Sequence, residues 1–194
     1  MMLANKISFA ITIIMWIVFA IAFLLLKRRQ KQNEQKKNKL AMIGMMLEGV
    51  GFAFVFTVRR EPFTNIFQMN SSIQILLTIF SGILAIASVW LGLSAVKTLG
   101  KQWNIKAQII EGHELITTGP YKIVRHPIYS ALFGLLIVTG YSITQLWAFI
   151  IAIVFYFIGT IFRTRVEEQL LIQHFGDQYE KYKKKVPAII PYIY

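Results

Sequence analysis

The chain has 194 residues, of which 56% are hydrophobic and only 15% are charged. This composition departs from that of a soluble globular protein, and the length suits a single domain. No cysteine is present, which excludes disulfides, thiolate nucleophiles and cysteine-ligated metals. The net charge is +12, but the basic residues cluster at the ends of apolar blocks. That placement indicates membrane orientation and contact with lipid headgroups, and it excludes nucleic acid as the expected partner.

Five apolar blocks predict an all-α integral membrane bundle of about five transmembrane helices. A hydrocarbon layer of about 30 Å needs about 20 apolar helical residues to cross it. The predicted helices run over residues 7–26, 40–58, 72–96, 128–143 and 145–162. The break between the last two is so short that they form a tight hairpin. From 163 to 185 the apolar residues recur at helical spacing, which predicts an amphipathic helix that lies on the cytoplasmic surface or extends the fifth helix.

The basic residues also predict an orientation. The loop 27–39 carries seven basic residues against Glu34, so it is expected in the cytoplasm, with the N-terminus outside. Five spans then place the polar strip 97–129 and the segment 163–185 on the same cytoplasmic face. We expect one domain, 1–194, in which N-terminal membrane helices (1–98) precede a functional half (99–194).

The segment from Gly112 to Tyr129 is polar and rich in turn residues, and it includes two of the three histidines and two of the five prolines. Pro127 suits the first turn of a helix, where the missing N–H has no partner in any case. His126 then takes the cap position, beside a helix N-terminus able to hold a carboxylate or phosphate. The alternative is that His126 only caps the helix while Arg125 reaches to lipid phosphate.

Three ionisable residues form a second cluster near the end of the fifth apolar block. Arg163 and Glu167 stand one helical turn apart, so an intrahelical salt bridge is one interpretation. The adjacent Glu167 and Glu168 need cationic or donor partners at a membrane boundary, so holding ribose hydroxyls or an amino group is the other. Glu48 lies inside the second apolar block and must face the bundle, be protonated or pair with a polar group.

Familiar soluble-enzyme motifs are missing from the sequence. It has no phosphate loop, no GxGxxG after a strand, no HExxH and no serine elbow, and we predict no metal site. A non-catalytic scaffold or transporter subunit would explain the charge clusters. It would not explain why two polar motifs flank one helical hairpin.

Together, these two motifs resemble the isoprenylcysteine carboxyl methyltransferase family, which is related to the membrane phospholipid methyltransferases. The first motif reads Gly112-His113-x-Leu115-Ile116-x-x-Gly119-Pro120-Tyr121-x-x-Val124-Arg125-His126-Pro127-x-Tyr129. The second reads Arg163-x-x-x-Glu167-Glu168-x-x-Leu171-x-x-x-Phe175-Gly176-x-x-Tyr179-x-x-Tyr182-x-x-x-Val186-Pro187. The resemblance covers roughly Leu99 to Pro191.

The resemblance implies an S-adenosylmethionine-dependent methyltransferase whose cofactor pocket is built from helices. Its implied cofactor-binding residues are Gln108, His113, Glu114, Leu115, Ile116, Tyr121, Arg125, His126, Pro127, Ile128, Tyr129 and Glu167. Arg163 and Glu168 are the expected catalytic residues, with Arg163 at the acceptor. The acceptor would be lipophilic or prenylated, and the leading candidate is the carboxylate of a prenylated cysteine. The alternative is a phospholipid or another lipophilic amine, thiol or phenol.

This hypothesis depends on one spatial prediction. The His126-Pro127 corner and the paired glutamates must converge across the last hairpin into a single niche. A carboxylate acceptor is already ionised at neutral pH, so the scarcity of candidate general bases agrees with it. An amine or phenol would instead need proton removal, for which Tyr129, His126 and Glu168 are candidates.

Overall fold

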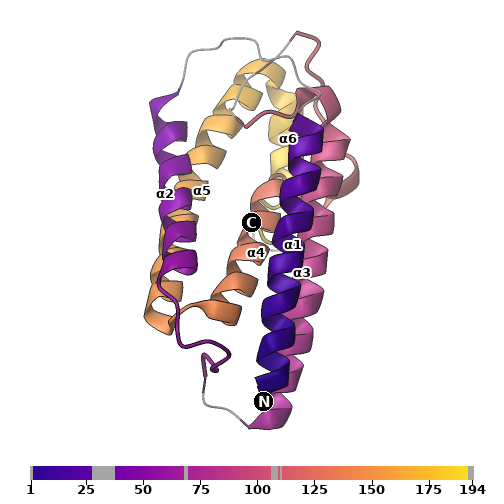
Figure 1. Ribbon diagram of the computed structural model, residues 1–194. Helices are drawn as coiled ribbons and strands as arrows, with labels where there is room; N and C mark the ends of the chain where they lie inside the picture. The colour runs from indigo at the N-terminus through magenta and orange to yellow at the C-terminus, as the bar shows by residue number, and fades with distance from the viewer. Residues whose placement is uncertain (1, 28–37, 68–69, 106–108, 110, 192–194) are drawn as a thin grey trace.

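The computed structural model describes residues 2–27, 38–67, 70–105, 109 and 111–191, and these form a helical bundle (Figure 1). The helices are α1 (Met2–Lys27), α2 (Lys39–Thr57), α3 (Ser71–Leu99), α4 (Pro127–Ile143), α5 (Leu146–Phe175) and α6 (Asp177–Lys185), with short 3-10 turns η1 (Gly100–Gln102) and η2 (Gly119–Lys122). The described residues contain no named strand, so the predicted all-α class is confirmed.

Local chemistry explains where the helices begin and end. Asn38 precedes α2 and accepts from two backbone N–H groups of its first turn, and Asn70 precedes α3 and accepts from one, that of Ile73. Pro127 begins α4, as its fixed φ and missing N–H predict. Gly176 ends α5 with φ at 53°, a left-handed conformation that glycine adopts without strain.

α4 lies at the centre of the bundle. α2 packs along α5, α1 packs along α3, and α4 contacts all four of these helices (Figure 1). On α4, Leu135 belongs to a buried cluster with Phe19 and Val89, on the α1–α3 side. Its neighbour Leu136 belongs to another cluster, with Tyr156, on the α2–α5 side. The two helix pairs are therefore held together by opposite faces of one short helix.

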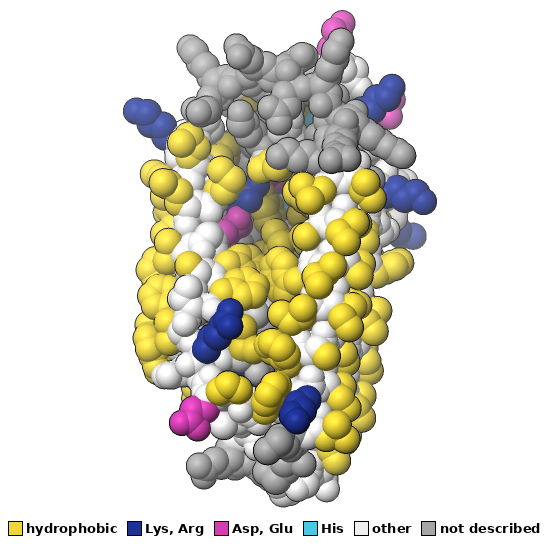
Figure 2. Space-filling model, viewed as in Figure 1, with side chains coloured by type: hydrophobic (Ala, Val, Ile, Leu, Met, Phe, Trp, Pro, Cys, Tyr) yellow, Lys and Arg dark blue, Asp and Glu magenta, His cyan; other side chains and the backbone are white. Residues whose placement is uncertain are grey.

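The outer surface of the bundle is apolar. Met46, Leu76 and Trp90, on two different helices, each expose 64–67% of their surface. Hydrophobic side chains also cover most of the face shown in Figure 2. α1, α2, α3 and α5 are long and apolar enough to cross a membrane, and α4 is an apolar helix of 17 residues. The chain is thus a multi-pass membrane protein whose outer side chains meet lipid instead of water.

The structure decides between the two alternatives for residues 163–185. α5 runs without interruption to Phe175, so the polar segment extends the fifth helix. The amphipathic C-terminal helix is therefore only α6, which follows the turn at Gly176. Of the basic loop 27–39 that predicts the orientation, residues 28–37 lie outside the described residues.

Candidate functional site

A cavity of about 250 Å³ lies at the end of the bundle where α4 begins. The start of α4, the second half of α5, α6 and the connection between α3 and α4 all contribute to its wall. Of the residues predicted from the sequence, the following line it: His113, Glu114, Leu115, Ile116, Tyr121, Arg125, His126, Pro127, Ile128, Tyr129, Arg163 and Glu167. Gln108 falls outside the described residues, and its predicted cofactor contact stays a prediction.

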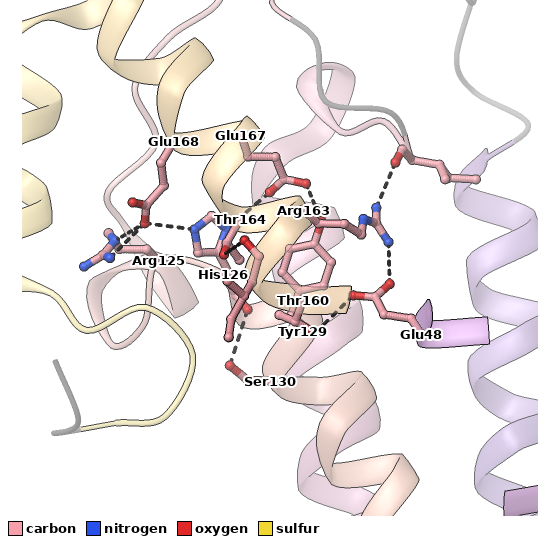
Figure 3. Close-up of polar contacts among 12 residues, drawn as sticks. Glu48, Arg125, His126, Tyr129, Ser130, Thr160, Arg163, Thr164, Glu167 and Glu168 are labelled. Atoms are coloured by element: carbon pink, nitrogen blue, oxygen red, sulfur yellow. Dashed lines mark hydrogen bonds and ion pairs between the residues drawn. The ribbon is translucent and has the colours of Figure 1, made fainter. Parts of the chain in front are cut away.

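The ring of His126 sits between the two glutamates of α5 (Figure 3). Its Nδ1 lies 3.3 Å from Glu167 Oε2, and its Nε2 lies 3.3 Å from Glu168 Oε1. Burial lowers the pKa of His126, but the hydrogen bonds and negative charges of both glutamates raise it by more, and the net shift is upward. Both ring nitrogens face carboxylate oxygens, which favour the protonated ring because each nitrogen can then donate to one of them. The predicted convergence of the histidine-proline corner and the paired glutamates is confirmed.

The alternative that His126 only caps α4 does not fit the structure. The residue does occupy the cap position of α4, but its side chain makes no capping hydrogen bond, because the two glutamates hold the ring. Its carbonyl oxygen instead accepts from the backbone N–H groups of Tyr129 and Ser130, at 3.1 and 3.2 Å. Pro127 has no N–H, so in this first turn the N–H of Ile128 is the donor left for a ligand.

Glu168 lies on the far side of His126 from Glu167, among basic side chains. Arg125 reaches Glu168 Oε1 with Nη2 at 2.8 Å, and Lys183 Nζ lies 2.6 Å from Glu168 Oε2. The Arg125 side chain is only 9% exposed, which does not fit the alternative that it reaches lipid phosphate. Glu168 does not appear among the described cavity-lining residues. Glu168 thus holds His126 and Arg125 in place, and its expected catalytic role stays a prediction.

The tail beyond α6 also supports this corner of the cavity. The backbone N–H of Arg125 donates to Pro187 O at 2.8 Å, and that of His126 donates to Ala188 O at 2.9 Å. The Ser130 hydroxyl donates to the carbonyl of Ile189. Residues 186–189 therefore form a strap across the start of α4. These backbone contacts carry no signal in the sequence beyond the recurrence of Val186-Pro187 in the family motif.

Arg163 does not form the intrahelical salt bridge with Glu167 that the one-turn spacing suggested. Its Nη1 donates to Glu48 Oε2 at 2.8 Å, and its Nη2 donates to Ile105 O at 2.9 Å. The hydroxyl of Tyr129 donates to Glu167, and the Arg163 guanidinium lies over the Tyr129 ring, 4.8 Å from its centre. Tyr129 thus separates the anionic and cationic groups of α5 (Figure 3).

Two polar atoms of the cavity residues have no protein partner among the described residues. They are His113 Nδ1 and the Tyr179 hydroxyl oxygen, and both atoms are buried. Burial and, secondarily, the nearby His174 lower the pKa of His113, so its ring is neutral. Buried polar atoms normally have a hydrogen-bond partner, and a polar ligand in the cavity would supply it.

Several cavity residues were missed by reasoning from sequence, among them Gln102, Asn104, Leu170, Tyr179 and Tyr182. The two tyrosines belong to the second motif but were not among the implied cofactor-binding residues. Gln102 and Asn104 follow α3 in a stretch without a recognisable pattern. The sequence offered no signal for them beyond polarity at the end of an apolar block.

The fold and the cavity define a multi-pass α-helical membrane protein with one polar site at the end of its bundle. Residues 77–173, which run from α3 through most of α5, match the model of the isoprenylcysteine carboxyl methyltransferase family. The chain belongs to this family and is a membrane methyltransferase.

Individual relatives agree with this assignment. The chain is 31% identical over 172 residues to the protein-S-isoprenylcysteine O-methyltransferase of Schizosaccharomyces pombe, covering 83% of this chain and 70% of the yeast protein. It is 37% identical over 105 residues to protein-S-isoprenylcysteine O-methyltransferase B of Arabidopsis thaliana, covering 52% of each chain. The identity to the human protein-S-isoprenylcysteine O-methyltransferase is 32% over 115 residues, covering 52% of this chain and 36% of the human one. The matches therefore span about half of the plant protein and about a third of the human one.

Proposed function

We propose that the cavity binds S-adenosylmethionine and that the protein transfers its methyl group to the carboxylate of an S-prenylated cysteine. One observation carries this proposal. Glu167 and Arg163 are fixed on the same wall of one cavity, as an anionic and a cationic group separated by Tyr129. A cavity with these two groups has a place for a cationic donor and a place for an anionic acceptor.

The donor side of the cavity would be formed by Glu167, His113, Tyr179 and the start of α4. When bound, S-adenosylmethionine supplies an activated methyl group. Glu167 can accept a hydrogen bond from hydroxyl or ammonium groups of a ligand. The unpaired His113 Nδ1 and Tyr179 hydroxyl add polar contacts, and the first-turn N–H of Ile128 suits a carboxylate. His126 and Glu168 hold Glu167 and the helix start in position.

Arg163 would bind the acceptor. Two of its five N–H groups are used by Glu48 and Ile105, which leaves others for a carboxylate in the cavity. A carboxylate is ionised at neutral pH and needs no general base. Both nitrogens of His126 face glutamate oxygens, so neither is directed at an acceptor from which a proton must be taken. This favours a carboxylate over the amine, thiol or phenol alternatives.

The acceptor's lipid chain would enter from the membrane. Phe19 and Phe23 of α1 and Leu132 of α4 form an apolar part of the cavity wall. Figure 2 shows the face between α1 and α2 hollowed toward the site, with hydrophobic side chains along both walls. Farther along α1, the Trp16 ring packs against Phe52 of α2, 5.4 Å between centres. A prenyl chain lying in this hollow would exclude water and align the carboxylate with the donor.

The cavity would face the cytoplasm. α6 contributes to the cavity wall and carries Lys181, Lys183, Lys184 and Lys185. The end of α1 and the start of α2, which flank the basic stretch 27–39 in the sequence, lie at the same end of the bundle (Figure 1). Basic residues concentrate on the cytoplasmic side of membrane proteins, and the N-terminus would then lie outside.

Methyl transfer in detergent tests the proposal. The purified protein is incubated with labelled S-adenosylmethionine and either N-acetyl-S-farnesylcysteine or its carboxamide. We expect label in the acid and none in the carboxamide, because the carboxamide has no anionic oxygen to attack. Label in the carboxamide or in a phospholipid, with none in the acid, would refute a carboxylate acceptor.

Calorimetry tests the cofactor site separately. Glu167→Gln should weaken S-adenosylmethionine binding by at least tenfold, because a carboxylate is lost from the cavity. Glu180→Gln is the matched control, since Glu180 is exposed on α6. Equal affinity in the two variants would count against the assigned donor site.

A further inference from the structure

Glu48 lies in the middle of a membrane helix, and the function proposed above gives it no role. We propose that Glu48 is a positioning residue, which orients the Arg163 guanidinium toward the acceptor carboxylate and balances its charge. This inference rests on the proposed function and deepens it, because it makes acceptor recognition depend on a residue that lines no part of the cavity. It also assigns a function to α2, the only long helix with no residue in the cavity wall among those described.

The contacts of Glu48 use both of its carboxylate oxygens. Oε2 accepts from Arg163 Nη1 at 2.8 Å, and Oε1 accepts from the Thr160 hydroxyl at 3.1 Å (Figure 3). The side chains of Glu48 and Arg163 are only 7% and 13% exposed. Thr160 is fully buried, so its hydroxyl is held in place as well. A carboxylate held at both oxygens has little freedom to turn, and it fixes the guanidinium that it binds.

Close packing of α2 against α5 makes this pairing possible. An added Cβ at Gly44 would stand 2.6 Å from Gly159 O, and one at Gly159 would stand 2.5 Å from Gly44 O. Each glycine precedes a partner of the ion pair by four residues, Glu48 on α2 and Arg163 on α5. Because α2 and α5 run antiparallel (Figure 1), each glycine faces the ion-pair partner on the other helix. The added Cβ at Gly44 would stand 2.7 Å from Arg163 Cγ, and the one at Gly159 would stand 3.0 Å from Glu48 Cγ. The glycines therefore let the two helices approach closely enough for the two side chains to meet. The two glycines and the ion pair therefore belong to the same packed contact between α2 and α5.

The remaining contacts of Arg163 cannot replace Glu48. Its Nη2 donates to the carbonyl of Ile105, and its face lies over the Tyr129 ring. Both contacts hold a guanidinium, but neither carries a full negative charge. Glu167, the nearest acid along α5, is engaged by His126 and Tyr129. Among the described residues, Glu48 is the one carboxylate that contacts Arg163, and breaking a buried pair leaves an uncompensated charge.

Charge balance predicts a specific kinetic signature. Without Glu48, the buried Arg163 would hold an acceptor carboxylate more tightly and make it a poorer nucleophile. Glu48→Gln keeps an oxygen that accepts from Nη1 and removes only the charge. It should lower the KM for the prenylcysteine acid and lower kcat, each at least threefold. Glu48→Ala removes the contact as well, so Arg163 loses its orientation and the acceptor KM should rise at least tenfold.

A double-mutant cycle tests the proposal. The acceptor kcat and KM are measured for wild type, Glu48→Gln, Arg163→Ala and the double variant, and calorimetry confirms that each binds S-adenosylmethionine. If Glu48 acts through Arg163, Glu48→Gln changes neither constant by more than twofold once Arg163 is alanine. Glu61→Gln, the same substitution at an exposed residue between α2 and α3, serves as the control.

Two results would overturn the proposal. One is a Glu48→Gln enzyme with the acceptor KM and kcat of the wild type. The other is an effect of Glu48→Gln that is as large with alanine at position 163 as with arginine. In both cases an active wild type would leave the proposed function standing. A wild type that binds the donor but does not methylate the prenylcysteine acid would refute the proposed function together with the role of Glu48.

Discussion

Replacing Gly44 by alanine is expected to force α2 away from α5. The new Cβ would stand 2.6 Å from Gly159 O and 2.7 Å from Arg163 Cγ, whereas ordinary contact begins at 3.4 Å. The oxygen belongs to helix backbone, so it cannot swing aside as a flexible side chain can. Overpacking of this kind costs about 1–3 kcal/mol of the free energy of unfolding. Part of this is offset because alanine favours a helix over glycine by about 1 kcal/mol.

Gly49 on the same helix provides the matched control. It is exposed, and an added Cβ there meets nothing within 4 Å. Gly49→Ala therefore has the gain in helix preference without the clash, and the difference between the two variants isolates the overpacking. Thermal unfolding in detergent should place Gly44→Ala several degrees below Gly49→Ala. In the methyl-transfer assay, only Gly44→Ala should raise the KM for the prenylcysteine acid, because it separates Glu48 from Arg163.

The same pair of variants can refute this reasoning. If Gly44→Ala melts no lower than Gly49→Ala, then α2 and α5 are not packed closely enough for the glycines to matter. If it melts lower but keeps the acceptor KM of the wild type, the glycines stabilise the bundle without placing the ion pair.

Three further predictions concern the corner at the start of α4. Glu167 and Glu168 raise the pKa of His126, so the protonated ring stabilises the fold fully below about pH 6.5 and that contribution is lost as the pH rises through the raised pKa. Thermal unfolding of the wild type should show this alkaline loss, and His126→Asn should not. Arg125→Met leaves Glu168 with fewer partners and should cost about 1.5–3 kcal/mol in chemical denaturation, so an unchanged midpoint would contradict the buried network. Tyr182→Phe removes the hydrogen bond that ties α6 to the η2 turn, which should cost about 0.5–1.5 kcal/mol. A Tyr182→Phe protein as stable as the wild type would contradict the predicted contribution of this bond.

Features that depend on neighbouring residues were predictable from the sequence. The apolar blocks gave every long helix, and the start of α4 fell at Pro127 as expected. The number of predicted membrane crossings between the two polar motifs placed both motifs at the same end of the bundle. There His126 meets Glu167 and Glu168. The end of α5 was left open between two alternatives, because the residues after 162 become polar while their helical hydrogen bonding continues to Phe175.

Which residues belong to the site was predicted from a family resemblance and not from local sequence patterns. The residues around the cavity came from resemblance to a family, because composition and spacing alone left His126 and the glutamates open to structural interpretations. Aromatic and apolar members such as Phe19 and Leu170 cannot be recognised in this way. At helical spacing, a side chain that faces a cavity has the same pattern as one that faces a core.

By itself, the sequence determined that this is a bundle of membrane helices, where those helices lie along the chain, and which family the C-terminal half resembles. These properties follow from hydropathy, turn residues and motifs, which act within a few residues of one another. The tertiary structure alone decided which charges are paired. Arg163 binds Glu48, which is 115 residues away, and not Glu167, which is only one turn away. In a low-dielectric interior a buried charge pairs with whatever the helix packing brings within reach, and two facing glycines set that packing.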